Sequence, residues 1–144
     1  MKIDNTDLNI LALLKDNGRI QNNEIASRLS ISEGTVRNRI KKLIDNNFLS
    51  IKGLVNPCLI KNKQIVLIGI NISKRKDLES APDLIAKLDY VTSVYMVSGR
   101  YDLLIELFIE PGRLLNFLSI DLAAIDHIAT TESFIVLKSW KRWI

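Results

Sequence analysis

A basic segment in the first third of the chain carries the side chains best suited to contact another molecule. Residues 32–42 read Ser-Glu-Gly-Thr-Val-Arg-Asn-Arg-Ile-Lys-Lys. A guanidinium group can bond O6 and N7 of guanine, a carboxamide can bond N6 and N7 of adenine, and an ammonium group can bind phosphate oxygens. These residue types in one segment predict that it binds double-stranded DNA.

Three residues of this segment are predicted to face the edges of bases. Arg37 is assigned to guanine and Asn38 to adenine, because each side chain can make a bidentate pair with that base. Gly34 has no side chain, so we expect it to let the start of a helix approach the groove closely.

The other polar residues of the segment are predicted to hold the DNA backbone. Ser32 and Thr35 lie where a helix would begin, and a helix N-terminus attracts phosphate. Backbone contacts supply affinity, register and salt sensitivity without reading sequence. The basic residues assigned to phosphates are Arg39, Lys41 and Lys42. Arg39 has an alternative partner within the chain, an ion pair with Glu24 or Asp45.

Two short helices are expected before this segment. The first has Asp4 or Thr6 as its cap and ends near Asn17, where Gly18 is expected to adopt a left-handed cap. The second uses an asparagine as its N-cap and buries one apolar face. Its candidate caps are Asn22 and Asn23, and its buried residues are Ile25, Ala26 and Leu29.

A third helix is predicted from Ser32, its N-cap, to about Asn46. At about 100° per residue, the apolar residues fall on one side and the polar ones on the other. Those predicted to face inward are Val36, Ile40, Leu43 and Ile44. A short helix, a turn over residues 30–32 and a basic third helix are typical of a helix-turn-helix. Residues 48–55 look strand-like and are expected to add a wing.

Residues 64–144 are predicted to form a second domain with the order βαββαβ. Strands are expected over 65–72, 91–98, 103–109 and 131–140, and helices are expected to begin at Pro82 and Pro111. The predicted fold class is therefore α+β: a winged helix-turn-helix over residues 1–52, a linker over 53–63, and a ferredoxin-like (RAM/ACT-like) domain. In that fold two helices cover one face of a four-stranded sheet, which leaves the other face without cover.

Finer patterns within the second domain lead to further expectations. Glu106 and Glu110 are expected on the polar side of the third strand, opposite its apolar residues. In the two helices the apolar residues are expected to face inward. Those residues are Leu84, Ile85 and Leu88 in the first helix and Leu114, Leu115, Leu118 and Leu122 in the second.

Composition narrows the classes of function. Of the 20 basic and 16 acidic residues, nine and six lie in residues 1–52, so the basic excess sits mainly there. The single cysteine, Cys58, excludes an internal disulfide and a multi-thiolate zinc site, which indicates a reducing compartment. There is no signal-like start and no membrane-length apolar run. We therefore expect a cytoplasmic protein without a metal or a membrane partner.

The motifs resemble those of the Lrp/AsnC, or feast/famine, family of transcription regulators. In the first domain they are Asp7-Leu8-Asn9-Ile10-Leu11, Asn17-Gly18-Arg19-Ile20, Glu24-Ile25-Ala26 and residues 32–40, followed by Leu43. In the second they are residues 98–104, similar to a Gly-x-Tyr-Asp loop, and residues 131–137, similar to a Thr-x-Thr-x-x-Val-Leu strand. The resemblance covers essentially the whole chain.

The resemblance implies a small effector, usually an amino acid, and no other cofactor. It assigns Gly99, Tyr101 and Asp102 to the effector loop, with Thr131 and Ser133 contributing hydroxyls between neighbouring subunits. A carboxylate for an ammonium group and backbone N–H donors for a carboxylate suit an amino acid. Glycine and aspartate are also what a tight hairpin turn needs, so both interpretations stay open.

Two residues depart from the family pattern. Asn47 stands where glycine is common after the recognition helix, although asparagine can still adopt a left-handed cap. Ser133 stands where a second threonine is usual, so it keeps the hydroxyl but lacks a methyl group. This second departure leaves the identity of the effector open.

Assembly into a homodimer is expected, because the open sheet face needs cover and a twofold dimer would present two recognition helices. The resemblance implies dimers that often assemble further, up to octamers. Trp140 and Trp143 could pack at such contacts, and packing within the monomer is the interpretation we favour.

Two other functions compete with regulation. Siroheme decarboxylases share this two-domain architecture, but the one histidine, His127, is expected in a loop and no Ser-His-Asp set or glycine-rich phosphate loop is present. We therefore expect no enzyme. A helix-turn-helix that has lost DNA and serves only protein contact is the third possibility, and the retained basic residues argue against it.

Overall fold

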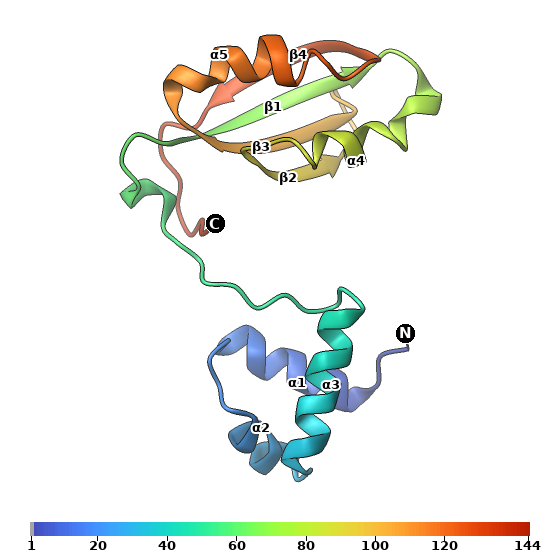
Figure 1. The fold of residues 1–144 in the computed structure, drawn as a ribbon, viewed down its shortest axis with the longest axis vertical. Coiled ribbons are helices and arrows are strands. Elements are labelled where there is room, and N and C mark those ends of the chain that lie inside the picture. The colour runs from blue at the N-terminus through green and yellow to red at the C-terminus, as the bar shows by residue number, and fades with distance from the viewer. Residues whose placement is uncertain (1) are drawn as a thin grey trace. The chain divides into compact units, whose positions relative to one another are not determined.

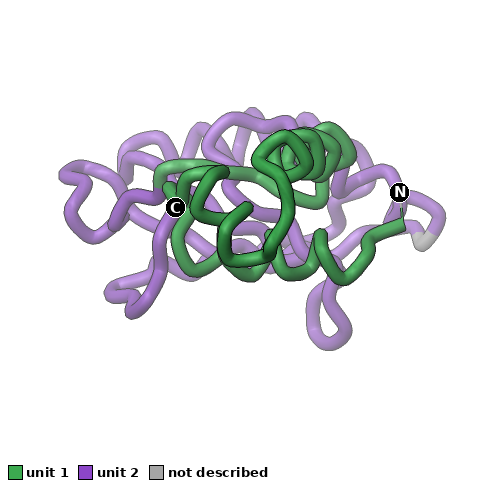
Figure 2. The backbone as a smooth tube through the Cα atoms, turned by 90° about the horizontal axis from the view of Figure 1, so that it is seen from below, with its two compact units in different colours: residues 1–53 green, residues 54–144 purple. Residues whose placement is uncertain are grey.

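The structure is a computed structural model that describes residues 2–144, apart from the side chain of Arg75. The chain divides into two compact units, one running to Gly53 and the other from Leu54 to Ile144 (Figure 2). No helix of the described residues has the length and apolar character needed to cross a membrane.

The first unit consists of three helices (Figure 1). They are α1 (Asn5–Asp16), α2 (Asn22–Leu29) and α3 (Glu33–Asp45). One apolar stripe of each helix faces a shared core, as amphipathic periodicity requires. The fully or nearly fully buried residues of this core are Ile10, Leu14, Ile25, Ala26, Val36 and Leu43.

Reciprocal hydrogen bonds define the start of α1. The Asp7 N–H donates to the Asp4 carboxylate at 2.9 Å, and the Asp4 N–H donates to the Asp7 carboxylate at 3.1 Å. This capping box satisfies two helix N–H groups, so the predicted cap at Asp4 is confirmed. At the other end Asn17 is extended and its side chain accepts from the Arg19 N–H. The left-handed cap predicted at Gly18 is therefore wrong.

The turn between α2 and α3 forms as predicted, but two details differ. The N-cap of α2 is Gln21, and both candidate asparagines lie inside the helix. Ser30 ends α2 in the left-handed region, with a φ of 55°. On α3, Ile44 is 44% exposed, so its predicted inward position is wrong.

The predicted wing does not form in the part of the chain that the structure describes. Asn47 takes the left-handed conformation, with a φ of 58°, and the Phe48 and Leu49 N–H groups both donate to the Leu43 carbonyl. These bonds form the C-terminal turn of α3. Residues 50–56 are irregular. Apolar residues alone do not make a strand where no neighbouring strand supplies hydrogen bonds.

The second unit has the predicted βαββαβ order (Figure 1). Its strands are β1 (Gln64–Ile72), β2 (Val91–Met96), β3 (Leu103–Ile109) and β4 (Ile128–Ile135). They form one antiparallel sheet in the order β2-β3-β1-β4. This is the arrangement of the ferredoxin-like fold.

Both main helices cover the same face of this sheet. Ala81 and Ile85 of α4 (Ala81–Ile85) pack into the same core as Phe117 and Leu122, which follow α5 (Leu114–Asn116). Phe117–Asp121 continues α5 as a π-helical turn. The strand residues in this core are Val66, Ile68, Ile70, Leu103, Ile105, Leu107 and Ile109.

Several predicted boundaries and inward positions are wrong. The strand β4 begins at Ile128 and ends at Ile135, so residues 136–140 do not belong to it. The strand β2 ends at Met96 instead of residue 98. Leu84 and Leu115 were expected inward but are 51% and 73% exposed. Short helical segments bury fewer residues than their apolar content suggests.

The sheet face opposite the helices carries an ion pair that joins the sheet to the end of the chain. Glu106 of β3 is 8% exposed and accepts from Thr92 Oγ1 at 2.8 Å and from Arg142 Nε at 3.2 Å. This bond raises the pKa of Arg142 above its usual value. Glu106 therefore lies on the side of β3 opposite the apolar residues, as predicted, but it is buried there because a segment beyond β4 covers it.

The end of the chain also pairs with the segment that precedes β1. The Val55 and Ile144 backbones exchange two hydrogen bonds, of 2.7 Å and 3.1 Å. Residues 136–144, here called the C-terminal tail, are therefore attached to both β3 and residue 55. Trp140 and Trp143 are 75% and 51% exposed, so the favoured packing within the monomer is wrong.

Candidate DNA-binding surface and effector loop

Ser32 caps α3, and its hydroxyl is used in doing so. Its Oγ accepts from the Thr35 N–H at 3.1 Å and lies 2.8 Å from Thr35 Oγ1. The cap satisfies one of the N–H groups that an isolated helix leaves free. Ser32 is exposed and Thr35 half-buried, so both hydroxyls stand at the positive end of the helix.

The exposed side of α3 carries most of the residues assigned to DNA. Val36 and Leu43 are fully buried on the opposite side. Among these exposed side chains Arg37 pairs with Glu33 Oε1 of its own helix at 2.6 Å, and both groups are largely exposed. An exposed pair of this kind is weak and can be exchanged for a base or a phosphate. The exposed residues are Gly34, Arg37, Asn38, Lys41 and Lys42.

Arg39 differs from its neighbours on α3 because it is committed to the start of α1. Its Nη1 donates at 2.8 Å both to Asp4 Oδ2 and to Asp7 Oδ1. The hydrogen bond to Asp7 raises the pKa of Arg39. The pKa of Asp4 is lowered, chiefly by the hydrogen bond that its carboxylate accepts from the Asp7 N–H and then by the bond from Arg39. The predicted alternative pairing with Glu24 or Asp45 is wrong, since Glu24 pairs with Arg28.

Asp7 explains why this ion pair matters to the fold. The residue is 3% exposed, and a buried carboxylate needs a partner. Arg39 supplies that partner from the helix that carries the predicted base contacts. The signal in the sequence is the pair of aspartates at the start of the first helix, of which only Asp4 is predicted to act, as a cap.

In the second unit, the loop between β2 and β3 requires its glycine. Gly99 has a φ of 142°, in a region that residues with a side chain rarely adopt. The Val97 N–H donates to the Asp102 carbonyl at 3.0 Å and closes the loop. This loop therefore exposes backbone around residue 99 at one end of the sheet.

Asp102 ties the loop to the end of β1. Its Oδ2 accepts from the Ile72 N–H at 2.8 Å, and its own N–H donates to the Ile70 carbonyl at 3.0 Å. One carboxylate oxygen is thus used within the chain. The hairpin interpretation of this residue therefore has structural support, and the other oxygen is the one that an ammonium group would contact.

Tyr101 packs flat against Gly69 on the sheet face opposite the helices. A Cβ at position 69 would lie 2.6 Å from Tyr101 Cγ, so only glycine fits beneath the ring. The Tyr101 hydroxyl donates to Glu132, which also pairs with Arg100 at 3.0 Å. The bond to Glu132 raises the pKa of Tyr101 above its usual value.

The two hydroxyl residues of β4 point to the other face of the sheet. Thr131 pairs with Ile70 and Ser133 with Ile68, and both isoleucines belong to the core beneath the helices. Glu132 pairs with Gly69, on the same face as Tyr101. Because side chains alternate along a strand, one chain does not bring Thr131 and Ser133 together with Tyr101.

Glu132 is the residue of this region that the sequence interpretation missed. It is half-buried and receives both the Tyr101 hydroxyl and the Arg100 guanidinium. An acidic residue between two hydroxyl residues of an alternating strand was the available signal.

Comparison with known proteins assigns each of the two units to a described protein family. Residues 3–50 match the family described as winged helix-turn-helix DNA-binding, and residues 65–143 match the Lrp/AsnC ligand binding domain. The chain is 34% identical over 101 residues to the HTH-type transcriptional regulator Ptr1 of Methanocaldococcus jannaschii, covering 69% of this chain and 68% of Ptr1. It is 31% identical to the regulatory protein AsnC of Escherichia coli K12, covering 95% of this chain and 91% of AsnC.

A solved structure agrees with these relatives. The L-Met complex of a transcriptional regulator from Neisseria meningitidis superposes with a TM-score of 0.71 at 26% identity, covering 98% of this chain and 94% of that one. The relatives are named as regulators, which argues against the enzyme alternative. The protein belongs to the Lrp/AsnC family of DNA-binding transcriptional regulators, with a helix-turn-helix unit and a ligand-binding unit.

Proposed function

We propose that α3 reads a specific sequence of double-stranded DNA through Arg37 and Asn38. The observation that carries this proposal is the separation of the two sides of α3, one anchored in the core by Val36 and Leu43 and the other exposed and basic. Arg37 suits guanine and Asn38 suits adenine, and Gly34 adds no bulk between the helix and the groove.

Contacts to DNA phosphates are assigned to other residues of α3 and to its N-cap. Lys41 and Lys42 are exposed and supply salt-sensitive affinity, and the hydroxyls of Ser32 and Thr35 lie at the N-terminus of α3. Arg39 has a different role in this proposal. Since two carboxylates already hold its guanidinium, it orients α3 and leaves the DNA contacts to its neighbours.

We also propose that an amino acid binds at the loop formed by residues 97–102. The free oxygen of Asp102 suits its ammonium group, and backbone N–H groups around Gly99 suit its carboxylate. The ring of Tyr101, which packs against Gly69, would supply apolar surface to this site. The Neisseria meningitidis relative was solved with L-Met, an amino acid, which supports this class of effector.

The effector site is proposed to be completed by a second copy of the chain. Thr131 and Ser133 face away from Tyr101 within one chain, so their hydroxyls can join the loop only if another subunit presents them. The sheet face opposite the helices also exposes apolar residues that a homodimer would cover. These residues include Leu67, Tyr95 and Phe134. Higher homo-oligomers would form if the dimers contacted one another through a second interface.

The mechanism is then a shift between two states of the assembly. An amino acid that binds one assembly state more tightly than the other changes the spacing of the two recognition helices. DNA affinity changes by the same coupling factor with which DNA changes effector affinity.

The test is to measure DNA affinity by fluorescence anisotropy while each amino acid is titrated. We expect at least one amino acid to change the affinity, and Asp102→Asn to weaken its effect by about tenfold or more. Asparagine keeps an oxygen that accepts from the Ile72 N–H, so the loop is retained. Asp83→Asn, at an exposed position of α4, is the matched control. A response of Asp102→Asn equal to that of the native protein, or no response to any amino acid, would contradict the proposal.

A further inference from the structure

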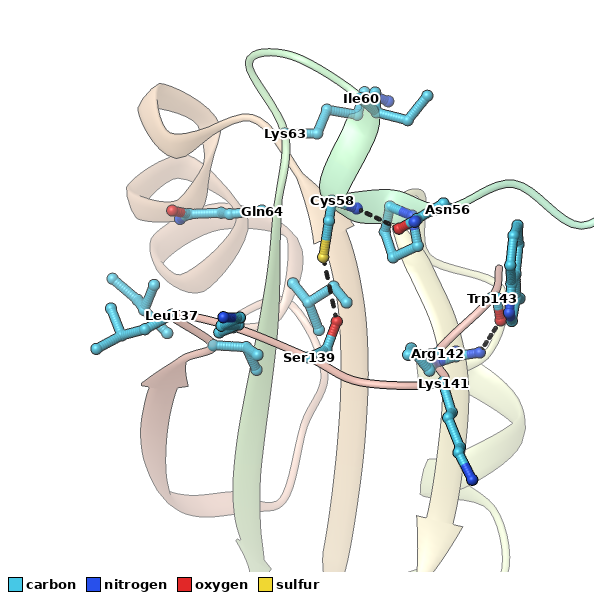
Figure 3. Close-up of a pocket in the computed structure, with 15 residues that line it drawn as sticks. Asn56, Cys58, Ile60, Lys63, Gln64, Leu137, Ser139, Lys141, Arg142 and Trp143 are labelled. Carbon is cyan, nitrogen blue, oxygen red and sulfur yellow. Dashed lines mark hydrogen bonds between the residues drawn. The ribbon is translucent and has the colours of Figure 1, made fainter.

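A pocket of about 830 Å³ lies between the short 3-10 helix η1 (Pro57–Leu59) and the C-terminal tail (Figure 3). The walls on both sides are attached to the rest of the unit. Asn56 caps η1 by accepting from the Cys58 N–H at 3.0 Å, and Cys58 Sγ lies 3.4 Å from Ser139 Oγ of the tail. The volume falls within the range of about 300–1,000 Å³ that small-molecule pockets occupy.

The charged side chains that line this pocket are all basic. They are Lys63, Lys138, Lys141 and Arg142, and no carboxylate is among the described lining residues. Carboxylates behind the walls balance two of them. Glu106 holds Arg142, and Glu110 lies 3.6 Å from Lys63 Nζ. Within the part of the chain that the structure describes, neither Lys138 nor Lys141 has an ion-pair partner, and Lys138 Nζ lies 5.2 Å from the centre of the ring of Trp140, which does not line the pocket.

The rest of the wall is apolar or neutral. Ile65, Ile135 and Trp143 supply hydrocarbon and aromatic surface, and Ser139 supplies a hydroxyl. Trp143 is 51% exposed and Ile135 is 53% exposed, so both have surface left for a ligand to cover. A pocket with apolar walls, whose charged lining residues are all basic, is complementary to a molecule with an apolar body and one negative charge.

We propose that this pocket is a second small-molecule site, which binds a carboxylate with an aromatic or branched apolar body and no ammonium group. A 2-oxo acid belongs to this class. The corresponding amino acid does not, because its ammonium group would enter a pocket whose described lining holds four basic residues and no carboxylate to receive it. The two sites therefore differ in charge, since the loop at Asp102 offers a carboxylate and this pocket offers none.

Phenylpyruvate and phenylalanine are suitable probes because they share a phenyl body and a carboxylate. They differ in that phenylalanine carries an ammonium group where phenylpyruvate has a keto oxygen. Cys58 is the chain's one cysteine and lines the pocket, so its alkylation reports on this site alone. The full-length protein is treated with iodoacetamide, a neutral reagent, and the rate of alkylation is followed by mass spectrometry.

We expect phenylpyruvate to slow the alkylation of Cys58 in a saturable manner, and phenylalanine at the same concentration to leave the rate unchanged. The double variant Lys138→Ala/Lys141→Ala should require about fivefold more phenylpyruvate, or a higher excess, for the same protection. Lys61→Ala/Lys87→Ala removes the same charge from exposed positions that do not line the pocket, and should behave as the native protein does.

Several outcomes would overturn the proposal. One is an alkylation rate that phenylpyruvate does not change, and another is equal protection by phenylalanine. Protection that survives in Lys138→Ala/Lys141→Ala, or is lost equally in both double variants, would remove the assigned role of the two lysines. A thiol that reacts only after denaturation would show that another part of the assembly fills the pocket. Asp102→Asn should leave the protection intact, which separates this site from the amino-acid site.

Discussion

Arg39 Nη1 of the recognition helix lies 2.8 Å from Oδ1 of Asp7, a carboxylate that is almost fully buried at the start of α1. The same nitrogen donates to Asp4, which caps that helix. The position of α3 therefore depends on an ion pair between two helices that are far apart in the sequence. This pair gives a structural role to a residue that the sequence alone assigned to phosphate.

Replacing Arg39 should destabilise the first unit. Arg39→Gln leaves the Asp7 carboxylate buried without its cation, which should lower the free energy of unfolding by roughly 2 kcal/mol. Chemical denaturation followed by circular dichroism measures the change. Arg37→Gln is the matched control, because its exposed pair with Glu33 should contribute less than about 0.5 kcal/mol. Equal effects of the two substitutions would argue against the role of Arg39.

The salt dependence of DNA binding should separate phosphate contacts from structural residues. Lys41→Ala and Lys42→Ala should each reduce the slope of log K against log salt by about one. Arg39→Gln, measured where the variant remains folded, should keep the slope of the native protein. A reduced slope in Arg39→Gln would instead place Arg39 on the DNA backbone.

Acid should weaken the first unit through Asp4. Its pKa is held below the usual 3.8 by the Asp7 N–H and by Arg39. Stability from this group is therefore present above pH 3.8 and is lost as the pH falls through the lower pKa of the folded state. Thermal unfolding at a series of acidic pH values should show a shallower loss in Asp4→Asn than in the native protein. A loss of the same steepness in both proteins would contradict this assignment.

A methyl group at position 69 should displace Tyr101. The Cβ of Gly69→Ala would lie 2.6 Å from the ring, so the substitution should cost about 1–3 kcal/mol in the second unit. In a Tyr101→Ala background the same substitution should cost far less, which a double-mutant cycle measures. Gly53→Ala, where a Cβ meets nothing within 4 Å, serves as the control. Additive effects at the two positions would show that they do not interact.

Patterns within single elements were the most predictable part of this structure. The apolar alternation of β3 and the Ser32 cap of α3 follow from local periodicity, and both are confirmed. The order of the strands follows as well, since βαββαβ with short connections has few compact arrangements.

Contacts between distant segments were not predictable in the same way. The partners of Arg39 are Asp4 and Asp7, which lie 35 and 32 residues away, and no spacing rule links them. Arg142 bonds Glu106 across 36 residues, and this contact buries a glutamate whose side of the strand, but not its burial, follows from alternation. The prediction of a wing over residues 48–55 was wrong for a related reason. A strand needs a neighbouring strand, and the local sequence does not reveal whether one is present.

In the candidate effector site, too, local features could be predicted from the sequence and long-range contacts could not. The loop at Gly99 could be located from its residue types, and its positive φ agrees with that location. The two faces of β4 depend on its register against β1, which places Glu132 beside Tyr101 and turns Thr131 and Ser133 away. A shift of the register by one residue would reverse these positions.

Selection of binding sites from random duplex DNA tests most directly whether α3 reads DNA sequence through Arg37 and Asn38. The selection would be run with the native protein, Arg37→Ala and Asn38→Ala at several salt concentrations. We predict one enriched, nearly palindromic sequence, with the preference relaxed at a guanine in Arg37→Ala and at an adenine in Asn38→Ala. No enrichment with the native protein would contradict this role of α3. So would variants that both keep the sequence preference of the native protein.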